Sequence, residues 1–243
     1  MIKVQFKKLL KLINCLRVKE WRAPLRFGVA AALEHDFFFR NHNFNTVVDI
    51  GANTGQFSLV MKKNFPEANI FAFEPLKEPF FTYSKIFDND TRVNVFNSAI
   101  AQEAGVTKMH ISKSLDSSSL LELTELQNEI FPGTSAIGTQ NVSMGRLASF
   151  VRKEQIKGVS LLKLDVQGFE LEVLSGCEEL LHMFDMVYCE CSFFELYAGQ
   201  SLAPQIIEFM SVKGFVLQGF NNVKYDKNGS TVQADFIFCK AEQ

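Results

Sequence analysis

The chain has little net charge for its size. Its 243 residues include 25 Lys and Arg and 27 Asp and Glu, which gives a formal net charge of −2. A general nucleic-acid-binding protein needs a strong positive field to attract phosphates. This balance, and the lack of basic residues interleaved with aromatics in the main domain, exclude that class, so we expect no nucleic-acid partner.

Metal-type cysteine pairs and long apolar runs are also missing. The five cysteines form no CxxC pair and have no histidine at zinc-ligand spacing, which favours a reducing cytoplasm. Cys189 and Cys191 lie two apart in an apolar run, so we expect them to pack on one face of a strand. No apolar stretch reaches the ~20 residues of a membrane span. Lysines interrupt the N-terminus where a signal peptide needs an apolar core, so we expect a cytoplasmic protein.

Positive charge is concentrated at the N-terminus. Residues 1–26 contain eight basic residues and one acidic residue, which leaves 17 basic and 26 acidic residues in the rest. Apolar residues recur there at spacings of three and four with lysines between them, which predicts a basic amphipathic helix: Ile2, Phe6, Leu9, Ile13 and Leu16. This stripe could pack on the main domain, or residues 2–19 could bind an anionic membrane or a partner. We assign residues 1–44 to this segment and 45–243 to the main domain.

Short β-branched runs alternate with helical segments from residue 46 onward. This rhythm predicts a parallel sheet with helices on both faces, the α/β class. The expected strands are Thr46–Ile50, Asn69–Phe73, Arg92–Ile100, Ser160–Val166 and Met186–Ser192. The expected helices are Gln56–Phe65, Lys77–Phe87, Leu147–Glu154, Glu170–Leu181 and Pro204–Lys213.

Two stretches depart from this rhythm. Residues 106–146 resemble an insertion over the sheet edge, with an antiparallel pair, Val106–Ser112 and Gln140–Met144, and a helix near Leu120–Ile130 between them. At the end of the chain, Phe215–Gln218 and Gln233–Cys239 flank a turn that contains Asn-Gly, which predicts an antiparallel hairpin.

A glycine-rich turn, Asp49-Ile50-Gly51-Ala52-Asn53-Thr54-Gly55, follows the first predicted strand. Its glycines let the backbone turn tightly, and the next helix presents free amide N–H groups to a ligand. Dinucleotide enzymes use G-x-G-x-x-G to hold a pyrophosphate, and here Asn53 replaces the middle glycine. A pyrophosphate cofactor is therefore disfavoured. Asp49 could instead face the ammonium of an amino-acid group, whose carboxylate would bind the exposed amides.

Two further strand ends extend this pattern. The second strand ends at Glu74-Pro75, where an acid would reach the hydroxyls of a ribose. The third ends in Asn97-Ser98-Ala99-Ile100, small residues whose amides would flank an adenine ring. Each feature alone has an ordinary structural explanation, such as a turn cap. Their order along the chain predicts a site for an adenosine with an amino-acid tail, such as S-adenosylmethionine.

Four segments together resemble the FkbM family of S-adenosylmethionine-dependent methyltransferases: VVDIGANTGQFS, FAFEP, FNSAIAQEAG and LLKLDVQGFELEVLSGCEELL. The resemblance, from about Thr46 to Phe238, implies a Rossmann-like seven-stranded sheet, mostly parallel with a C-terminal antiparallel strand. It implies O-methylation of a hydroxyl on a sugar, glycan or polyketide-type metabolite. It places Asp49, Gly51, Asn53, Gly55, Glu74 and Ser98 on cofactor positions. Ala148 stands where the family commonly has Asp, which weakens any metal site, and we expect no metal.

Charged residues mark the end of the buried strand at 160–166. Lys163, Asp165 and Gln167 alternate there and so point the same way. Lys163 and Asp165 could form an ion pair that anchors the loop, or Asp165 could lie beside the methyl group and accept the proton of an acceptor hydroxyl. Glu190 on the next strand is a second candidate base. Because methyl transfer is an in-line displacement, positioning supplies most of its rate, and Gln167, where the family often has Glu, need not be acidic.

Other ionisable residues have simpler roles. Glu170 begins a helix, where a carboxylate caps free amides, and His110 and His182 are expected to be structural. Two alternative functions stay open: an oxidoreductase or epimerase that uses a nicotinamide cofactor, and a catalytically silent methyltransferase-like module that binds partners. The expected partner of an enzyme is a small-molecule or glycan acceptor.

Overall fold

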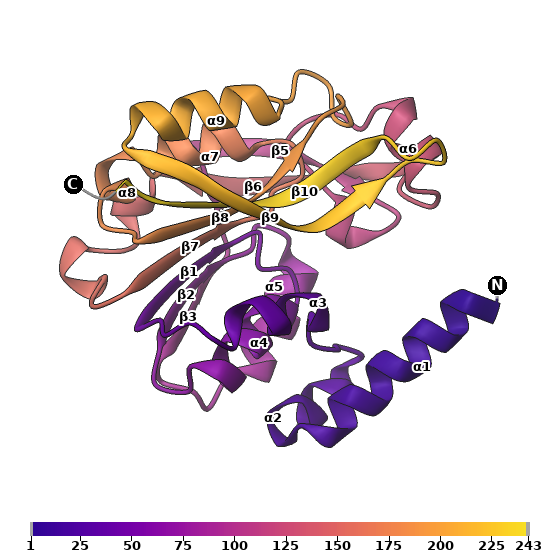
Figure 1. Cartoon of the computed structure of the whole chain (residues 1–243), viewed down its shortest axis with the longest axis horizontal. Helices are drawn as coiled ribbons and strands as arrows, with labels where there is room; N and C mark the ends of the chain where they lie inside the picture. Colours follow the sequence, from indigo (N-terminus) through magenta and orange to yellow (C-terminus); the bar gives the residue numbers. More distant parts are fainter. Residues whose placement is uncertain (1, 242–243) are drawn as a thin grey trace.

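Seven strands form the central sheet (Figure 1). The computed structural model describes residues 2–241, and side chains from residue 9 onward. The strand order is β3-β2-β1-β7-β8-β10-β9, in which β10 is antiparallel to both neighbours and the other pairs are parallel. The strands are β1 Thr46–Ile50, β2 Asn69–Phe73, β3 Val93–Phe96, β7 Ser160–Leu164, β8 Met186–Ser192, β9 Phe215–Tyr225 and β10 Thr231–Lys240. The predicted fold class is confirmed.

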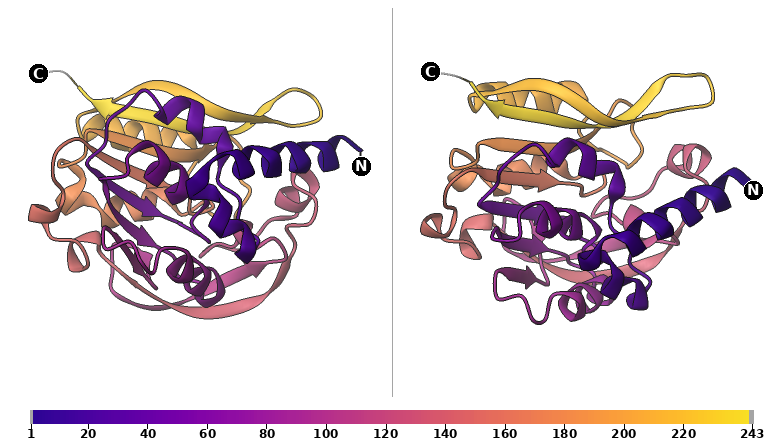
Figure 2. Two further views of the ribbon diagram at one scale, coloured as in Figure 1. Left: turned by 90° about the horizontal axis from the view of Figure 1, so that it is seen from below. Right: turned by 60° about the horizontal axis from the view of Figure 1, so that its bottom comes forward.

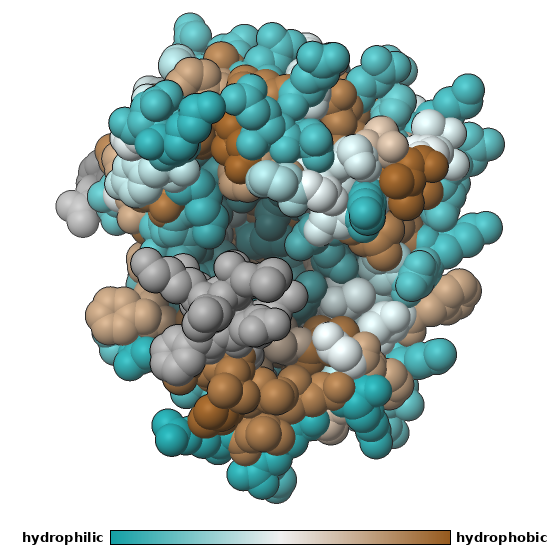
Figure 3. All heavy atoms as spheres, turned by 90° about the vertical axis from the view of Figure 1, so that its right-hand side faces the viewer, coloured by the Kyte–Doolittle hydropathy of each residue, from teal (hydrophilic) through white to brown (hydrophobic). Residues whose placement is uncertain are grey.

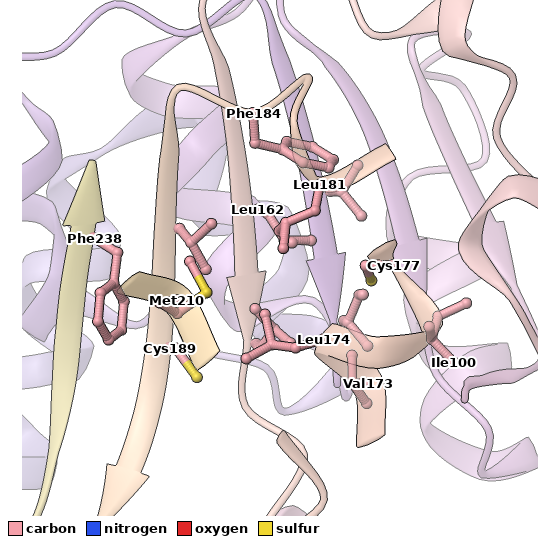
Figure 4. Packing of buried hydrophobic residues seen from close by; sticks show 14 of the residues in the cluster. Ile100, Leu162, Val173, Leu174, Cys177, Leu181, Phe184, Cys189, Met210 and Phe238 are labelled. Carbon is pink, nitrogen blue, oxygen red and sulfur yellow. The ribbon is translucent and has the colours of Figure 1, made fainter. Parts of the chain in front are cut away.

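Helices cover both faces of this sheet, as the alternating pattern predicted (Figure 1). One face carries α3 Leu33–Phe39, α4 Gln56–Asn64 and α5 Lys77–Ile86, and the other carries α7 Glu170–Gly176, α8 Glu178–Leu181 and α9 Ala203–Val212. Successive side chains of β1 point to opposite faces of the sheet, so Val47 packs into one apolar cluster and Val48 into the other. Figure 4 shows the second cluster, where α7 and α9 pack on the sheet. Cys189 and Cys191 both lie in it, which confirms their predicted packing.

A second sheet forms the predicted insertion. It has the order β4-β6-β5, with bounds β4 Ala99–Ile100, β5 Gly105–Ser112 and β6 Ala136–Gly145. The antiparallel pairing of β5 with β6 is confirmed. The prediction of one strand over Arg92–Ile100 is wrong, because the Asn97 side chain donates hydrogen bonds to the carbonyls of Glu74 and Pro75, each 2.9 Å away. The chain leaves the first sheet there, and β4 pairs with β6 instead.

Two predicted helices are wrong in extent. In place of a helix over Leu120–Ile130, α6 covers only Glu125–Ile130, because the Thr124 hydroxyl accepts the Gln127 amide and starts the helix late. In place of a helix over Leu147–Glu154 there are two 3₁₀ turns, η3 Leu147–Ser149 and η4 Lys153–Gln155, separated by the extended Arg152. A third 3₁₀ turn, η2, covers Leu115–Ser117.

The C-terminal hairpin is confirmed, although β9 extends well past the predicted end at Gln218. Its turn contains Gly229 at φ +84°, and the Asp226 side chain accepts the amides of Asn228 and Ser230. The hairpin places β10 between β8 and the edge strand β9, so residues 231–240 lie beside β8.

The N-terminal segment consists of α1 Ile2–Arg17, α2 Lys19–Arg22, the 3₁₀ turn η1 Ala23–Phe27 and α3. The predicted amphipathic helix is confirmed as α1, which extends outward from the body (Figure 2). Of the predicted stripe, Leu9, Ile13 and Leu16 are exposed and do not pack on the domain, whereas the neighbouring Cys15 is buried; the side chains of Ile2 and Phe6 lie outside the described residues. Within residues 2–241 no helix combines the length and apolar character needed to cross a bilayer.

Candidate active site

A cavity of about 270 Å³ lies at the carboxyl ends of the parallel strands. Loops that follow β1, β2, β3 and β7 meet there, as the topology of an open α/β sheet requires. Its walls include most of the predicted cofactor residues: Gly51, Asn53, Glu74, Pro75, Ser98 and Ala99. Lys163 and Asp165 also line it, and α1 and α3 contribute Lys11, Glu34 and His35.

The turn after β1 requires glycine at its first position. Gly51 has φ +76°, and a Cβ there would lie 1.9 Å from the backbone oxygen of Asp165. The amides of Gly51 and Ala52 both donate to the Phe73 carbonyl, and the Asn53 amide donates to the Glu74 carboxylate at 2.8 Å. The turn is therefore held between β2 and the loop after β7.

Gly55 has a different role from Gly51. It lies outside the cavity lining and starts α4 with φ +95°. A Cβ there would approach the rings of Phe87 and Tyr83 to 2.9 and 3.1 Å. Close packing of α4 on α5 explains this glycine, and any effect on a ligand is indirect.

Asp49 lies beneath the cavity and does not line it. The residue is fully buried, accepts the Ser58 hydroxyl at 2.8 Å and pairs with the Lys163 ammonium at 3.1 Å. Lys163 also donates to the Gly51 carbonyl at 2.9 Å, and its distance to the Asp165 carboxylate is longer, 3.9 Å. Burial alone would lower the pKa of Lys163, but the two carboxylates raise it above its usual value. The Asp49–Lys163 pair thus fixes the glycine turn from below.

Glu74 presents a buried carboxylate to the cavity. Its two oxygens accept the amides of Leu76 and Asn53, each at 2.8 Å, and these bonds fix the orientation of the carboxylate. Burial raises the pKa of Glu74 to about 7 in spite of these bonds. Hydroxyl donors from a ligand would stabilise the ionised form further. Ser98 and Ala99 continue this wall with small side chains.

Gln167 joins the two candidate bases. Its side-chain nitrogen donates to the carboxylates of Asp165 at 2.6 Å and Glu190 at 2.9 Å, and its oxygen accepts the Tyr197 hydroxyl at 2.7 Å. Burial, reinforced by Asp165 and Asp235, raises the pKa of Glu190 well above its usual range. Because a raised pKa favours the protonated form, the Glu190 carboxyl is less available to accept a proton, whereas the Asp165 side chain is 41% exposed and faces the cavity.

A second cavity, of about 360 Å³, continues from the first. Asp165, Gln167, His35, Glu34 and Asp116 line both, so they lie at the junction. Beyond the junction the lining is almost entirely polar: Ser114, Ser117, Gln127, Thr134, Glu190, Asn222, Lys224, Gln233 and Asp235, with Phe131. The first cavity fits a cofactor, and the second offers hydrogen-bond partners to a polar molecule.

The sequence analysis missed a cluster beside this junction. The hydroxyl of Tyr188 and the amide of Asn222 each donate to Asp235 at 2.7 Å, and His35 Nδ1 is 3.1 Å from the Tyr188 hydroxyl. Burial lowers the pKa of His35 to about 4, so the ring is neutral at pH 7. In the sequence, the only sign of this cluster is that Tyr188 lies two residues from Glu190 and so shares a strand face with it. His35, Asn222 and Asp235 are brought there by tertiary structure alone.

The remaining residues lie as follows. Glu170 accepts the amides of Val166 and Gly168 at 3.2 and 3.1 Å and so caps the loop before α7. His110 and His182 line neither cavity. Among the described residues no group of three His, Cys, Asp or Glu could hold a metal ion.

Comparison with known proteins identifies the family. The family model described as Methyltransferase FkbM domain matches residues 49–217, well over half of the chain. The chain belongs to the FkbM methyltransferase family. This FkbM protein is an enzyme of the methyltransferase class. The family match therefore favours methyl transfer over the alternative of an oxidoreductase or epimerase that uses a nicotinamide cofactor. S-adenosylmethionine is its cofactor, and the buried Glu74 carboxylate, the tight glycine turn and the small wall at Ser98 and Ala99 fit that molecule.

Individual relatives of this FkbM protein are distant. It is 28% identical over 195 residues to the methyltransferase sdnD of Sordaria araneosa, a match that covers 70% of this chain and 73% of the relative. It is 27% identical over 191 residues to the 2-O-methyltransferase NoeI of Sinorhizobium fredii, covering 74% and 76%. A solved structure of fibrillarin from Aeropyrum pernix with bound S-adenosyl-L-methionine is 10% identical, covers 86% of this chain and 72% of its own, and has a TM-score of 0.48.

Proposed function

We propose that this enzyme methylates a hydroxyl group of a polar, hydroxyl-rich acceptor such as a sugar, a glycan or a hydroxylated metabolite. The observation that carries the proposal is the polar second cavity, which opens from the cofactor cavity at Asp165. Its amides, hydroxyls and carboxylates donate and accept hydrogen bonds at several separate positions, which suits a molecule with several hydroxyls. The relative named as a 2-O-methyltransferase supports the same chemistry.

Asp165 is the proposed proton acceptor. When bound, S-adenosylmethionine supplies a methyl group on a positively charged sulfur. The acceptor hydroxyl would lie at the junction. Its oxygen gains the bond to the methyl carbon while the carbon–sulfur bond breaks, the sulfur keeps the electron pair and becomes neutral, and the hydroxyl proton passes to the Asp165 carboxylate. Oδ1 of Asp165 accepts the Gln167 amide, so Oδ2 is the atom that takes the proton. The Lys163 ammonium lies 3.9 Å from Oδ2 and places a positive charge beside the atom that takes the proton.

The test is Asp165→Asn, which keeps the shape of the side chain and removes the base. We expect kcat to fall by about 10²–10⁴-fold while the affinity for S-adenosylhomocysteine, measured by calorimetry, is unchanged. Asp88→Asn is the matched control, since Asp88 is exposed and lines neither cavity.

Acceptors should be screened with methyl-labelled cofactor against neutral sugars, amino sugars, hydroxylated macrolides and simple amines, with the methylated atom located by mass spectrometry. Methylation of nitrogen alone would overturn the assignment to hydroxyls. Full turnover by the Asp165→Asn variant would remove Asp165 from the chemistry and leave the hydroxyl assignment intact.

A further inference from the structure

The exposed face of α1 is an apolar surface without a partner among the described residues. Leu9, Leu10, Leu12, Ile13 and Leu16 have exposed fractions of 37 to 52%. Isolated exposed leucines are normal in proteins, but five on two successive turns of one helix form a continuous patch. Figure 3 shows hydrophobic residues gathered on the lower part of the face toward which α1 projects. The patch therefore needs an explanation other than folding.

The opposite side of α1 is attached to the body. Cys15 is fully buried in the apolar cluster that contains Trp21, and the Trp21 indole donates to the Leu59 carbonyl at 2.9 Å. Lys11 lies 3.5 Å from the Glu34 carboxylate on α3. The helix is thus held by one side, and its leucines face away from the domain because the attachment requires it.

Charge around this face is of one sign. Residues 1–26 contain eight basic residues and one acidic residue, Glu20, while the rest of the chain has 17 basic and 26 acidic residues. Arg17, Lys19, Arg22 and Arg26 are all exposed close to the leucines. Phe27, at the end of η1, adds an exposed aromatic ring. An apolar stripe bordered by cations is the pattern that binds anionic lipid surfaces.

A second copy of the chain is a poorer occupant. The spacing of Leu9, Ile13 and Leu16 would suit a two-stranded coiled coil, but Leu10 and Leu12 widen the stripe beyond such a narrow seam. α1 spans little more than two heptads, and stable coiled coils need three to four. Pairing two copies of a helix that has basic residues and no acidic ones would also oppose like charges.

We propose that the exposed face of α1 binds the surface of a bilayer that contains anionic lipids. The leucines enter the boundary between headgroups and acyl chains, and the arginines and lysines lie at the phosphates. The helix lies in the plane of the membrane, because it is not long and apolar enough to cross it.

The test is co-sedimentation of the full-length protein with vesicles of phosphatidylcholine alone or mixed with phosphatidylglycerol. We expect binding to the mixed vesicles, little to the neutral ones, and release as NaCl is raised from about 0.1 M to about 1 M, which shortens the Debye length from ~10 Å to ~3 Å. Equal binding to both vesicle types, or none to either, overturns the proposal.

Paired variants separate the two contributions. Leu9→Ser with Leu16→Ser removes apolar surface, and Arg17→Glu with Lys19→Glu reverses charge. Each pair should weaken partition to mixed vesicles by more than about tenfold. Val106→Ser with Val212→Ser is the matched control, because these valines are 69 and 77% exposed on β5 and α9. Cofactor affinity and circular dichroism, unchanged in all variants, exclude misfolding as the cause.

Self-association provides the competing outcome. If light scattering shows a wild-type dimer, the leucine variant is monomeric, and neither binds vesicles, then α1 binds a second copy and the membrane proposal is wrong. The measurement needs no methyl acceptor, so its result is independent of the proposed reaction.

Discussion

The cofactor half of the site and its acceptor half are built from different groups. In the cofactor half, backbone hydrogen bonds fix the shape: the amides of Gly51 and Ala52 donate to the Phe73 carbonyl, and Glu74 is held by the amides of Asn53 and Leu76. In the acceptor half, side chains bond to one another, as Gln167 does with Asp165 and Glu190. The first half should therefore respond to changes of shape, and the second to changes of charge and pH.

The largest effect is expected from a methyl group at Gly51. Gly51→Ala should weaken S-adenosylmethionine binding by more than about 100-fold, because the Cβ would meet the Asp165 carbonyl oxygen at 1.9 Å and the turn must move. Calorimetry measures this directly. Gly229→Ala is the control, since Gly229 also has a positive φ but nothing within 4 Å of its Cβ position. If Gly51→Ala bound S-adenosylmethionine with normal affinity, the cofactor half would not be sensitive to shape as proposed.

A slightly smaller effect concerns pH and Glu170. Burial raises its pKa from 4.5 to about 7 in the folded state. Above pH ~4.5 the unfolded chain loses this proton while the folded protein keeps it, so stability falls with rising pH until about pH 7. The shift corresponds to about 3 kcal/mol. Glu170→Gln should remove the contribution of this residue to the loss of stability, because a glutamine side chain does not titrate. Its amide oxygen can still accept the Val166 and Gly168 amides, so the loop keeps its hydrogen bonds.

Urea unfolding at about pH 5 and about pH 8 measures that difference. The variant should show a smaller drop in the free energy of unfolding than wild type, and the exposed Glu208→Gln should behave as wild type does. An unchanged drop in Glu170→Gln would mean that burial of this carboxyl does not govern the pH response.

The smallest of these effects is expected at Gln167. Gln167→Glu places a third carboxylate between Asp165 and Glu190 and removes the hydrogen bonds that the Gln167 amide donates to both. We expect kcat to fall by about tenfold and the acid limb of its pH profile to move to higher pH, since added negative charge raises the pKa of the base. The exposed Gln102→Glu is the control. A profile that kept its position would show that the acceptor half is less sensitive to charge than proposed.

The sequence predicted the cofactor half well because its signals are local. Thr46–Ile50 and Asn69–Phe73 were predicted with the bounds that the structure gives, and the glycine turn follows directly in the chain. A parallel sheet brings successive strand ends to one edge, so spacing along the chain translated into proximity. Asp49 and Gly55 belong to the same motif but support the turn from outside the cavity, which a motif cannot distinguish from binding.

The acceptor half was predicted only in part because it depends on long-range placement. Asp165, just after β7, and Glu190, on β8, were predicted, but Asp235 lies opposite Glu190, with Asn222 bonded to it, only because β10 pairs with β8. His35 comes from a helix before the first strand. No periodicity in the sequence encodes that order of strands, and the direction in which the α1 leucines face depended likewise on a tertiary contact at Cys15.

The close contact between Gly51 and the Asp165 carbonyl bears on how the enzyme responds to temperature. Asp165 also donates its amide to the Ile50 carbonyl at 3.2 Å, so two neighbouring backbones set the spacing between cofactor turn and base. Side chains exchange rotamers within nanoseconds, whereas paired backbone segments in a sheet centre open rarely. Alignment of the reacting groups should therefore persist on warming until the sheet itself begins to unfold.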